Sequence, residues 1–195
     1  MPEIIHFRGS DKIIKKKNLT NDIKATLEYV EDALYGTLHR GELLRQVLDE
    51  MGWRENGTLN ILDGRRYTYK GFKKGVAIEG SFAAYEFILE GMLRLQLGFD
   101  KGKIDAGVLL LTSQRSEKSS YGTSADLAKA EMEMLHPTIN VPVMVALFDL
   151  GKPMIPEEEG GEQNGVSVPA DEKGTRKGED IEAESEEVVQ AEKDV

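Results

Sequence analysis

Two long runs of apolar residues dominate the second half of the chain. Residues 104–112 read IDAGVLLLT, and residues 141–150 read VPVMVALFDL. Such runs are typical of strands that are buried on both faces of a sheet, as in parallel sheets covered by helices. Between them, the apolar spacing of SADLAKAEMEML, residues 124–135, predicts a helix. The sequence therefore predicts a sheet with helices on its faces.

The rest of the chain fits the same α/β class. Apolar positions spaced three or four residues apart predict helices over residues 19–35, 41–52 and 83–97. Shorter segments with alternating or continuous apolar residues predict strands over residues 57–64, 65–72 and 75–81. Together these elements predict a central mixed β-sheet flanked by helices, preceded by an N-terminal helical pair.

Composition divides the chain into a body and a tail. Residues 157–195 contain 14 acidic and 4 basic residues and no Phe, Tyr, Trp, Leu or Met. Such a segment buries too little apolar surface to offset its ordering entropy. We expect one domain over residues 1–155, with N-terminal helices in 1–55 and a core in 56–155. A disordered acidic tail is expected over residues 156–195.

Composition also excludes several classes of protein. The chain has no cysteine, so disulfides and thiolate zinc sites are excluded. No apolar run approaches the roughly 20 residues that a membrane-spanning helix needs. The N-terminus, MPEIIHFRGSDK, lacks the charged start and apolar stretch of a signal peptide. We expect a cytoplasmic protein.

Two carboxylates follow apolar segments. Asp63 comes after NIL and precedes a glycine, and Glu79 comes after VAI and also precedes a glycine. If their strands are neighbours, the two carboxylates meet, and a divalent cation between them would offset the cost of burying like charges. Ser81 lies two residues after Glu79, so on a strand it points to the same face. A metal held in this way would activate water for phosphoester hydrolysis.

A simpler interpretation of the same residues remains open. Asp63 and Gly64 form an ordinary turn dipeptide. Glu79 would then be paired with one of the nearby cations, Arg65, Arg66 or Lys74.

From about residue 59 to 149, the chain resembles the BamHI/BglII group of type II restriction endonucleases, within the PD-(D/E)xK nuclease superfamily. The resemblance rests on an ordered set of segments and covers roughly half of the chain. These segments are LD at 62–63, VAIEGSF at 76–82, a long helix, GKIDAGVLLLTS at 102–113, SSYGTSADLAKAEM at 119–132 and VPVMVALFD at 141–149.

The resemblance implies a restriction-endonuclease-like fold and roles for three residues. Asp63 and Glu79 would bind Mg²⁺, and Ser81 would position the attacking water. Ser81 falls where most members of the superfamily have lysine, and where BamHI-like and BglII-like enzymes have Glu and Gln. A serine hydroxyl holds a water but supplies neither a strong base nor a positive charge. The 16-residue step from Asp63 to Glu79 is nearer the BamHI-like arrangement, whereas the downstream half looks more like BglII.

The resemblance also implies a homodimer that binds duplex DNA and cuts one strand per subunit. Basic residues near the acids would contact phosphates, and the polar loop SQRSEKSSYG would read base edges. The expected DNA contacts are Arg65, Arg66, Lys74, Arg115, Lys118, Ser119 and Ser120. Lys70 and Lys73 flank the same site. Each of these side chains is, in the simpler interpretation, a solvated surface group.

The sequence therefore predicts a Mg²⁺-dependent, sequence-specific endodeoxyribonuclease of the type II restriction kind. The departure at Ser81 leaves an alternative: a catalytically impaired DNA-binding protein on the same fold. A third alternative is an interaction protein in which Asp63 and Glu79 pair with arginines. The tail is either a solubilising segment or a mimic of DNA that competes for a basic cleft.

Overall fold

The fold is taken from a computed structural model, which describes residues 1–82, 87–114 and 122–152. These residues belong to one compact unit, Met1–Pro156. The expected tail over residues 156–195 lies outside the described residues.

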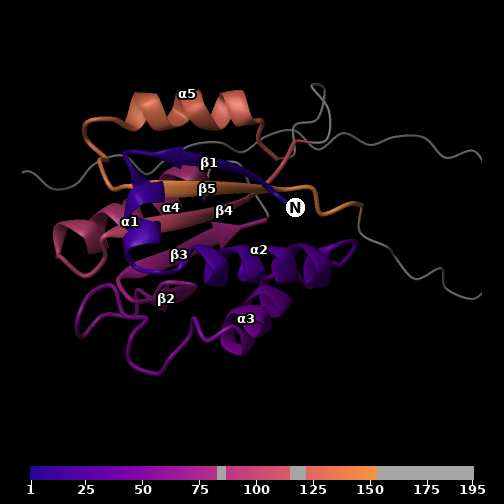
Figure 1. Cartoon of the computed structure of the whole chain (residues 1–195), viewed down its shortest axis with the longest axis horizontal. Coiled ribbons are helices and arrows are strands. Elements are labelled where there is room, and N and C mark those ends of the chain that lie inside the picture. The colour runs from indigo at the N-terminus through magenta and orange to yellow at the C-terminus, as the bar shows by residue number, and fades with distance from the viewer. Residues whose placement is uncertain (83–86, 115–121, 153–195) are drawn as a thin grey trace, which may run out of the picture. The chain divides into compact units, whose positions relative to one another are not determined.

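A mixed sheet forms the centre of this unit (Figure 1). Its strands are β1 Glu3–Phe7, β2 Gly71–Lys73, β3 Val76–Ser81, β4 Ala106–Thr112 and β5 Val143–Phe148, in the order β1-β5-β4-β3-β2. The central strands β3, β4 and β5 are parallel, and β1 and β2 pair antiparallel at the two edges. The three parallel strands are buried almost throughout, as their apolar runs predict.

Helices cover both faces of the sheet. They are α1 Ser10–Lys16, α2 Thr20–Leu34, α3 Arg40–Glu50, α4 Phe87–Asp100 and α5 Ala125–Leu135. Alternate residues of each central strand enter two separate apolar cores, one with α2 and α3 and the other with α4 and α5. Figure 1 shows α5 on one side of the sheet and α2 and α3 on the other. The predicted mixed sheet flanked by helices, with an N-terminal helical pair, is confirmed.

Two expected strands are not observed, and two observed elements were not expected. The sequence did not indicate β1 or α1, because β1 is a short edge strand with mostly exposed or half-buried residues. Strands expected over 57–64 and 65–72 are absent as such: the described segment folds back on itself, with a single bridge between Asn60 and Thr68. Only Gly71 and Phe72 of that stretch join β2. The alternation of aromatic residues in segment 65–72 does not reflect a strand: Tyr69 is buried and Tyr67 is exposed.

The described helices are short, from seven residues in α1 to fifteen in α2. None of them is both long enough and apolar enough to cross a membrane.

Candidate active site

Glu79 lies on β3, one residue past the part of that strand that β2 covers. β2 pairs only with Val76–Ile78, whereas β4 continues beside β3 as far as Ser81. The side chain of Glu79 is fully buried, with 0% of its residue surface exposed. The next residue is glycine because the strands approach closely there: a Cβ on Gly80 would lie 2.7 Å from Leu110 Cβ.

The Glu79 carboxylate has unusual surroundings. Neither oxygen has a hydrogen-bond partner of normal geometry among the described residues. Burial raises the pKa of Glu79 to about 7, because the charged form loses its hydration. The positive charges of Arg94 and Lys70 oppose that rise in pKa, and the negative charge of Glu90 adds to it. The nearby N–H of Gly80 has the smallest effect. Burying an unpartnered carboxylate costs folding free energy. Such a group, with its pKa strongly shifted, is therefore typical of a functional site.

Tyr69 lies beside this carboxylate. Its hydroxyl is buried, has no hydrogen-bond partner among the described residues, and occupies the space where Gly98 of α4 would carry a Cβ. Burial raises the pKa of Tyr69, and the charge of Glu79 raises it further. Glu79 and Tyr69 are therefore neighbouring dehydrated groups, and the Tyr69 hydroxyl reaches α4.

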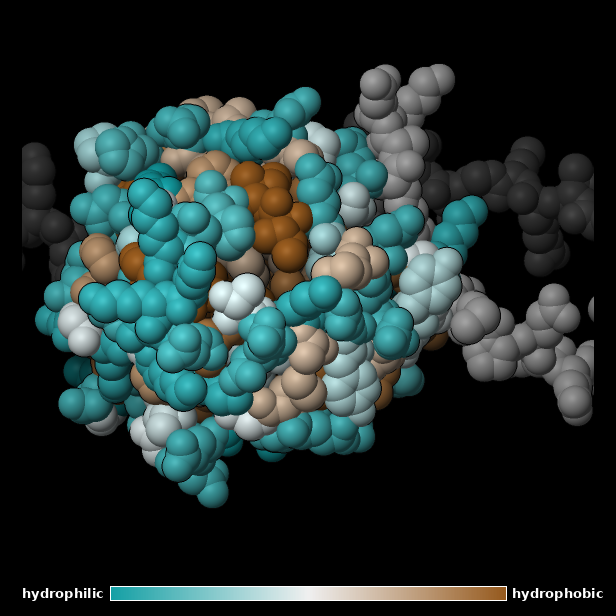
Figure 2. Space-filling view, viewed as in Figure 1, coloured by the Kyte–Doolittle hydropathy of each residue, from teal (hydrophilic) through white to brown (hydrophobic). Residues whose placement is uncertain are grey.

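A cationic cavity of about 260 Å³ borders Tyr69, while Glu79 itself does not line it. Its wall contains Tyr69, Thr68 and four cations: Arg45 from α3, Arg54, Lys70 and Arg94 from α4. A second cavity, of about 350 Å³, lies between β1 and α2 and is largely apolar, with Ile4, Ile23 and Met144 in its wall. Figure 2 shows an apolar patch among mostly hydrophilic side chains on the face it presents. Of these two cavities, only the cationic one suits a phosphate.

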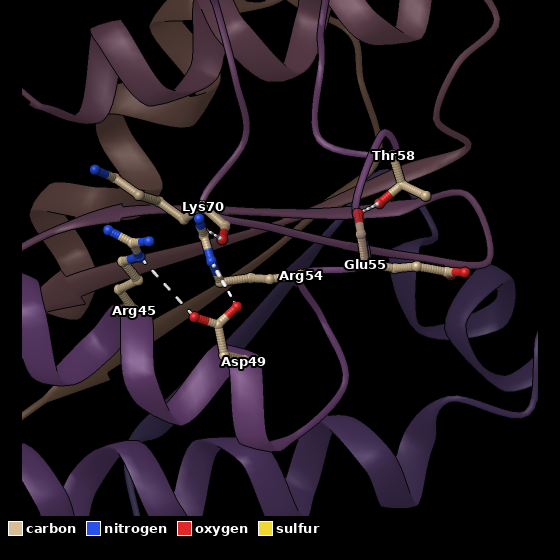
Figure 3. A network of polar contacts seen from close by, with 6 residues as sticks. All are labelled: Arg45, Asp49, Arg54, Glu55, Thr58 and Lys70. Atoms are coloured by element: carbon tan, nitrogen blue, oxygen red, sulfur yellow. Dashed lines mark hydrogen bonds and ion pairs between the residues drawn. The ribbon is translucent and has the colours of Figure 1, made fainter.

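Ion pairs fix several of the cations. Arg54 donates from Nε to Asp49 at 3.0 Å and from Nη1 to the backbone oxygen of Lys70 at 2.7 Å (Figure 3). Arg45 lies 3.9 Å from the same Asp49. Arg94 donates to Glu90 one turn earlier on α4, at 2.6 Å. These contacts hold the wall of the cavity in a defined arrangement.

Asp63 lies elsewhere in the structure. Its side chain is fully exposed, at 101%, on a turn with Gly64, and it pairs with Lys103 at 3.4 Å. A fully exposed carboxylate does not touch a fully buried one, so Asp63 and Glu79 are not brought together here. Ser81, by contrast, is half-buried on β3, two residues after Glu79 and on the same face of the strand.

The expected DNA contacts fall into two groups. Arg65 and Arg66 are exposed on the turn of Asp63, and Lys74 is exposed on the turn between β2 and β3, with a φ of 50°. The others, Arg115, Lys118, Ser119 and Ser120, lie outside the described residues.

Comparison with known proteins places this geometry in a family. The family model described as restriction endonuclease BglII/BglIII matches residues 3–146, which contain all five strands and helices of the described core except the end of β5. The chain belongs to this family of restriction endonucleases. Its family and fold are those of a type II site-specific nuclease. A search of curated proteins finds no match.

Solved structures of BglII show the same fold. The crystal structure of restriction endonuclease BglII complexed with a DNA 16-mer aligns with a TM-score of 0.54 and 14% identity, covering 78% of this chain and 77% of that one. Free BglII aligns with a TM-score of 0.53 and 16% identity, covering 76% and 79%. The resemblance inferred from the sequence is therefore confirmed.

Restriction endonucleases of this kind generally use a divalent metal ion, and the described residues meet that requirement in part. The two unpartnered oxygens of buried Glu79 suit a hard cation. No group of three or more acidic or histidine side chains among the described residues is placed to hold a metal. The structure thus offers one buried carboxylate, with Ser81 nearby, and the pairing of Asp63 with Glu79 stays a prediction.

Sequence reasoning missed most of the cationic wall. Lys70 was noted as a flanking base, but Arg45, Arg54 and Arg94 come from three separate segments and face one cavity only after folding. The sequence gives only a weak indication of this cavity. Arg94 lies off the apolar stripe of its helix, but a solvated arginine with no role in a site would lie there too.

Proposed function

We propose that the chain is a Mg²⁺-dependent endodeoxyribonuclease that hydrolyses phosphodiester bonds in duplex DNA. The observation that carries this proposal is Glu79, a buried carboxylate without a hydrogen-bond partner among the described residues. The charges of Arg94 and Lys70 act on it, and these two residues belong to the four cations that line a neighbouring cavity. The cations would neutralise the charge of a bound phosphate. A metal ion or a proton would neutralise the charge of the buried carboxylate. Family membership supports the same reaction.

Three residues take roles in the proposal. Glu79 binds the metal, Asp63 is its second proposed ligand, and Ser81 holds the attacking water through its hydroxyl. A bound divalent ion would polarise the phosphate and lower the pKa of a water molecule. Tyr69 and helix α4 cover the site on one side and exclude water from it.

Duplex DNA is the proposed partner. A relative with the same fold was crystallised with a DNA 16-mer. Arg65 and Arg66, on the turn of Asp63, and Lys74, on the turn between β2 and β3, are exposed and are proposed to contact phosphates. Residues Arg115, Lys118, Ser119 and Ser120 keep their proposed role in base recognition. We propose a homodimer, whose mass in solution is measurable by light scattering, and a cytoplasmic location, which suits a DNA substrate.

A second candidate is a catalytically impaired DNA-binding protein on the same fold. One observation favours it: Asp63 is exposed and paired with Lys103, so Glu79 is the one buried carboxylate among the described residues. Such a protein would bind duplex DNA with steep salt dependence and would cut nothing in Mg²⁺ or Mn²⁺.

The deciding experiment is cleavage of long unmethylated duplex DNA in Mg²⁺, Mn²⁺ or EDTA. We expect discrete, metal-dependent fragments from the wild type and none from Glu79→Gln. Glu3→Gln is the matched control, because Glu3 is exposed on β1, at the opposite edge of the sheet. Intact DNA in every lane, together with a mobility shift, would favour the impaired protein.

The same assay tests the proposed metal pair. If Asp63 is the second ligand, Asp63→Asn also loses cleavage while its thermal stability stays near that of the wild type, because its carboxylate is exposed. An Asp63→Asn protein that cuts normally would remove Asp63 from the site and leave Glu79 in place.

A further inference from the structure

The residue two positions after Glu79 on β3 carries no positive charge. In phosphodiester hydrolysis, negative charge builds up on the phosphate oxygens and on the leaving oxygen, and nearby cations stabilise that charge. Ser81, the residue that follows Glu79 on the same face of β3, is neutral. A cation from another element of the chain would add to the positive charge that a bound metal ion supplies.

Lys70 is attached directly to the strand that carries Glu79. Its backbone N–H donates to the oxygen of Ile78, the residue before Glu79, at 3.0 Å. Its backbone oxygen accepts from Arg54 at 2.7 Å, so both sides of the Lys70 peptide are fixed. The position of Lys70 relative to β3 is therefore set by the fold and not by a free loop.

The side chain of Lys70 lies in the wall of the cationic cavity and is exposed. Figure 3 shows Lys70 and Arg45 extending toward the same side, whereas Arg54 lies between Asp49 and the backbone of Lys70. The charge of Lys70 acts on the Glu79 carboxylate. Lys70 thus belongs to the wall of the proposed phosphate site and lies close enough to Glu79 for its charge to act there.

Lys70 also differs from the other cations of the cavity. Arg45 and Arg54 pair with Asp49, and Arg94 pairs with Glu90. Within the described part of the chain, the Lys70 ammonium group has no carboxylate partner. Its charge is available to a ligand without the breaking of an ion pair.

We propose that Lys70 is a catalytic residue of this nuclease, whose ammonium group contacts the phosphate being cut and supplies the positive charge that Ser81 lacks. This inference rests on the proposed function. The attacking water forms a bond to phosphorus as the bond between phosphorus and the leaving oxygen breaks. One water proton ends on the leaving oxygen, and the remaining hydroxyl stays on the phosphate. Lys70 keeps its proton and stabilises the charge on the phosphate oxygens.

The absence of cysteine from the chain allows a precise test. In Lys70→Cys, the single thiol can be alkylated with 2-bromoethylamine, which restores an ammonium group at nearly the length of lysine. Lys101→Cys, treated in the same way, is the control, because Lys101 is exposed at the end of α4 and outside the cavity wall. The measurements are the single-turnover cleavage rate, the Kd for the same DNA in EDTA, and Tm.

We expect Lys70→Cys to lower the cleavage rate by about 100-fold or more, the effect of removing one donor to a developing charge. The Kd in EDTA should change by less than about tenfold, since one phosphate contact among many is lost. Alkylation should recover most of the rate. Lys101→Cys should cut normally before and after alkylation.

Each outcome decides the proposal. A Lys70→Cys protein that cuts like the wild type, or a slow one that alkylation fails to restore while its Tm and Kd match the wild type, would overturn the role of Lys70. The proposed function would survive either result, because the wild type still cuts. A wild type that cuts no DNA would overturn both.

Discussion

Glu79 is an ionisable residue in an apolar environment. It is charged at neutral pH in an unfolded chain, yet it lies fully buried on an apolar strand. Its pKa rises to about 7 because burial outweighs the attraction of Arg94 and Lys70. The folded protein therefore holds a proton on Glu79 over a pH range in which the unfolded chain has lost it.

This difference predicts how stability changes with pH. Because the folded-state pKa of Glu79 is raised, its contribution is fully present below about pH 4.5 and is lost as the pH rises through about 7. The free energy of unfolding of the wild type, minus that of Glu79→Gln, should fall by up to about 3 kcal/mol between these limits. Urea denaturation in EDTA at a series of pH values measures it.

The control for this measurement is Glu3→Gln, whose carboxyl group is exposed. The difference between the wild type and Glu3→Gln should stay nearly constant with pH. If the difference for Glu79→Gln is equally flat, then Glu79 is not dehydrated in the folded protein.

At the scale of residues, burial was easier to predict than proximity. An acid at the end of an apolar strand indicates a buried carboxylate, and Glu79 is one. The meeting of Glu79 with Asp63 depended on a neighbouring strand, and residues 57–64 form a turn-rich segment instead. The cavity that contains Lys70 and Arg94 depends on contacts between distant segments, which a single sequence does not reveal.

At the scale of elements, the parallel strands were predictable because their burial on both faces leaves a continuous apolar run. The edge strands were not, because β1 and β2 are short and only partly buried. Edge strands pair with one neighbour, so their composition carries a weaker signal.

Helix α4, which carries Arg94 and Glu90 to the site, is fixed by Gln96. The Gln96 side chain accepts from the N–H groups of Asn140 at 2.8 Å and Val141 at 2.9 Å. Gln96→Leu would leave these two donors unpaired, and we expect the free energy of unfolding to fall by about 2–4 kcal/mol. Chemical denaturation checks this, with cleavage measured in parallel.

Gln46→Leu is the matched control for that substitution. Gln46 lies exposed on α3 and contacts only Glu50 of the same helix through its side-chain amide among the described residues. Its replacement should change stability by less than about 0.5 kcal/mol. Equal effects of the two substitutions would show that the Gln96 contacts do not hold α4.

At the scale of the whole molecule, charge is divided unevenly along the sequence. Residues 1–156 contain 21 acidic and 21 basic residues, so the net charge of −10 belongs to residues 157–195. A tethered negative charge repels DNA, and salt screens that repulsion. Ending the chain after Pro156 should therefore tighten DNA binding several-fold at low salt and have little effect at high salt.

Titration of both chains with the same DNA at two salt concentrations measures this effect. A chain whose tail acids are replaced by Gln and Asn is the control for length. If a separate peptide with the sequence of the tail also displaces DNA from the shortened chain, the tail competes for the DNA site directly. If the two chains bind DNA equally at low salt, the tail only affects solubility.

The early end of β2 has a consequence for how such a site can arise. The sheet is five strands wide at Ala77 and Ile78 but four strands wide at Glu79, where the row runs through Leu109 and Val145 to Ile5. The carboxylate stands at this step in width. Two more paired residues in β2 would replace the irregular backbone of Tyr69 and Lys70 with regular strand beside Glu79. In this chain, a missing piece of regular structure creates the room for chemistry.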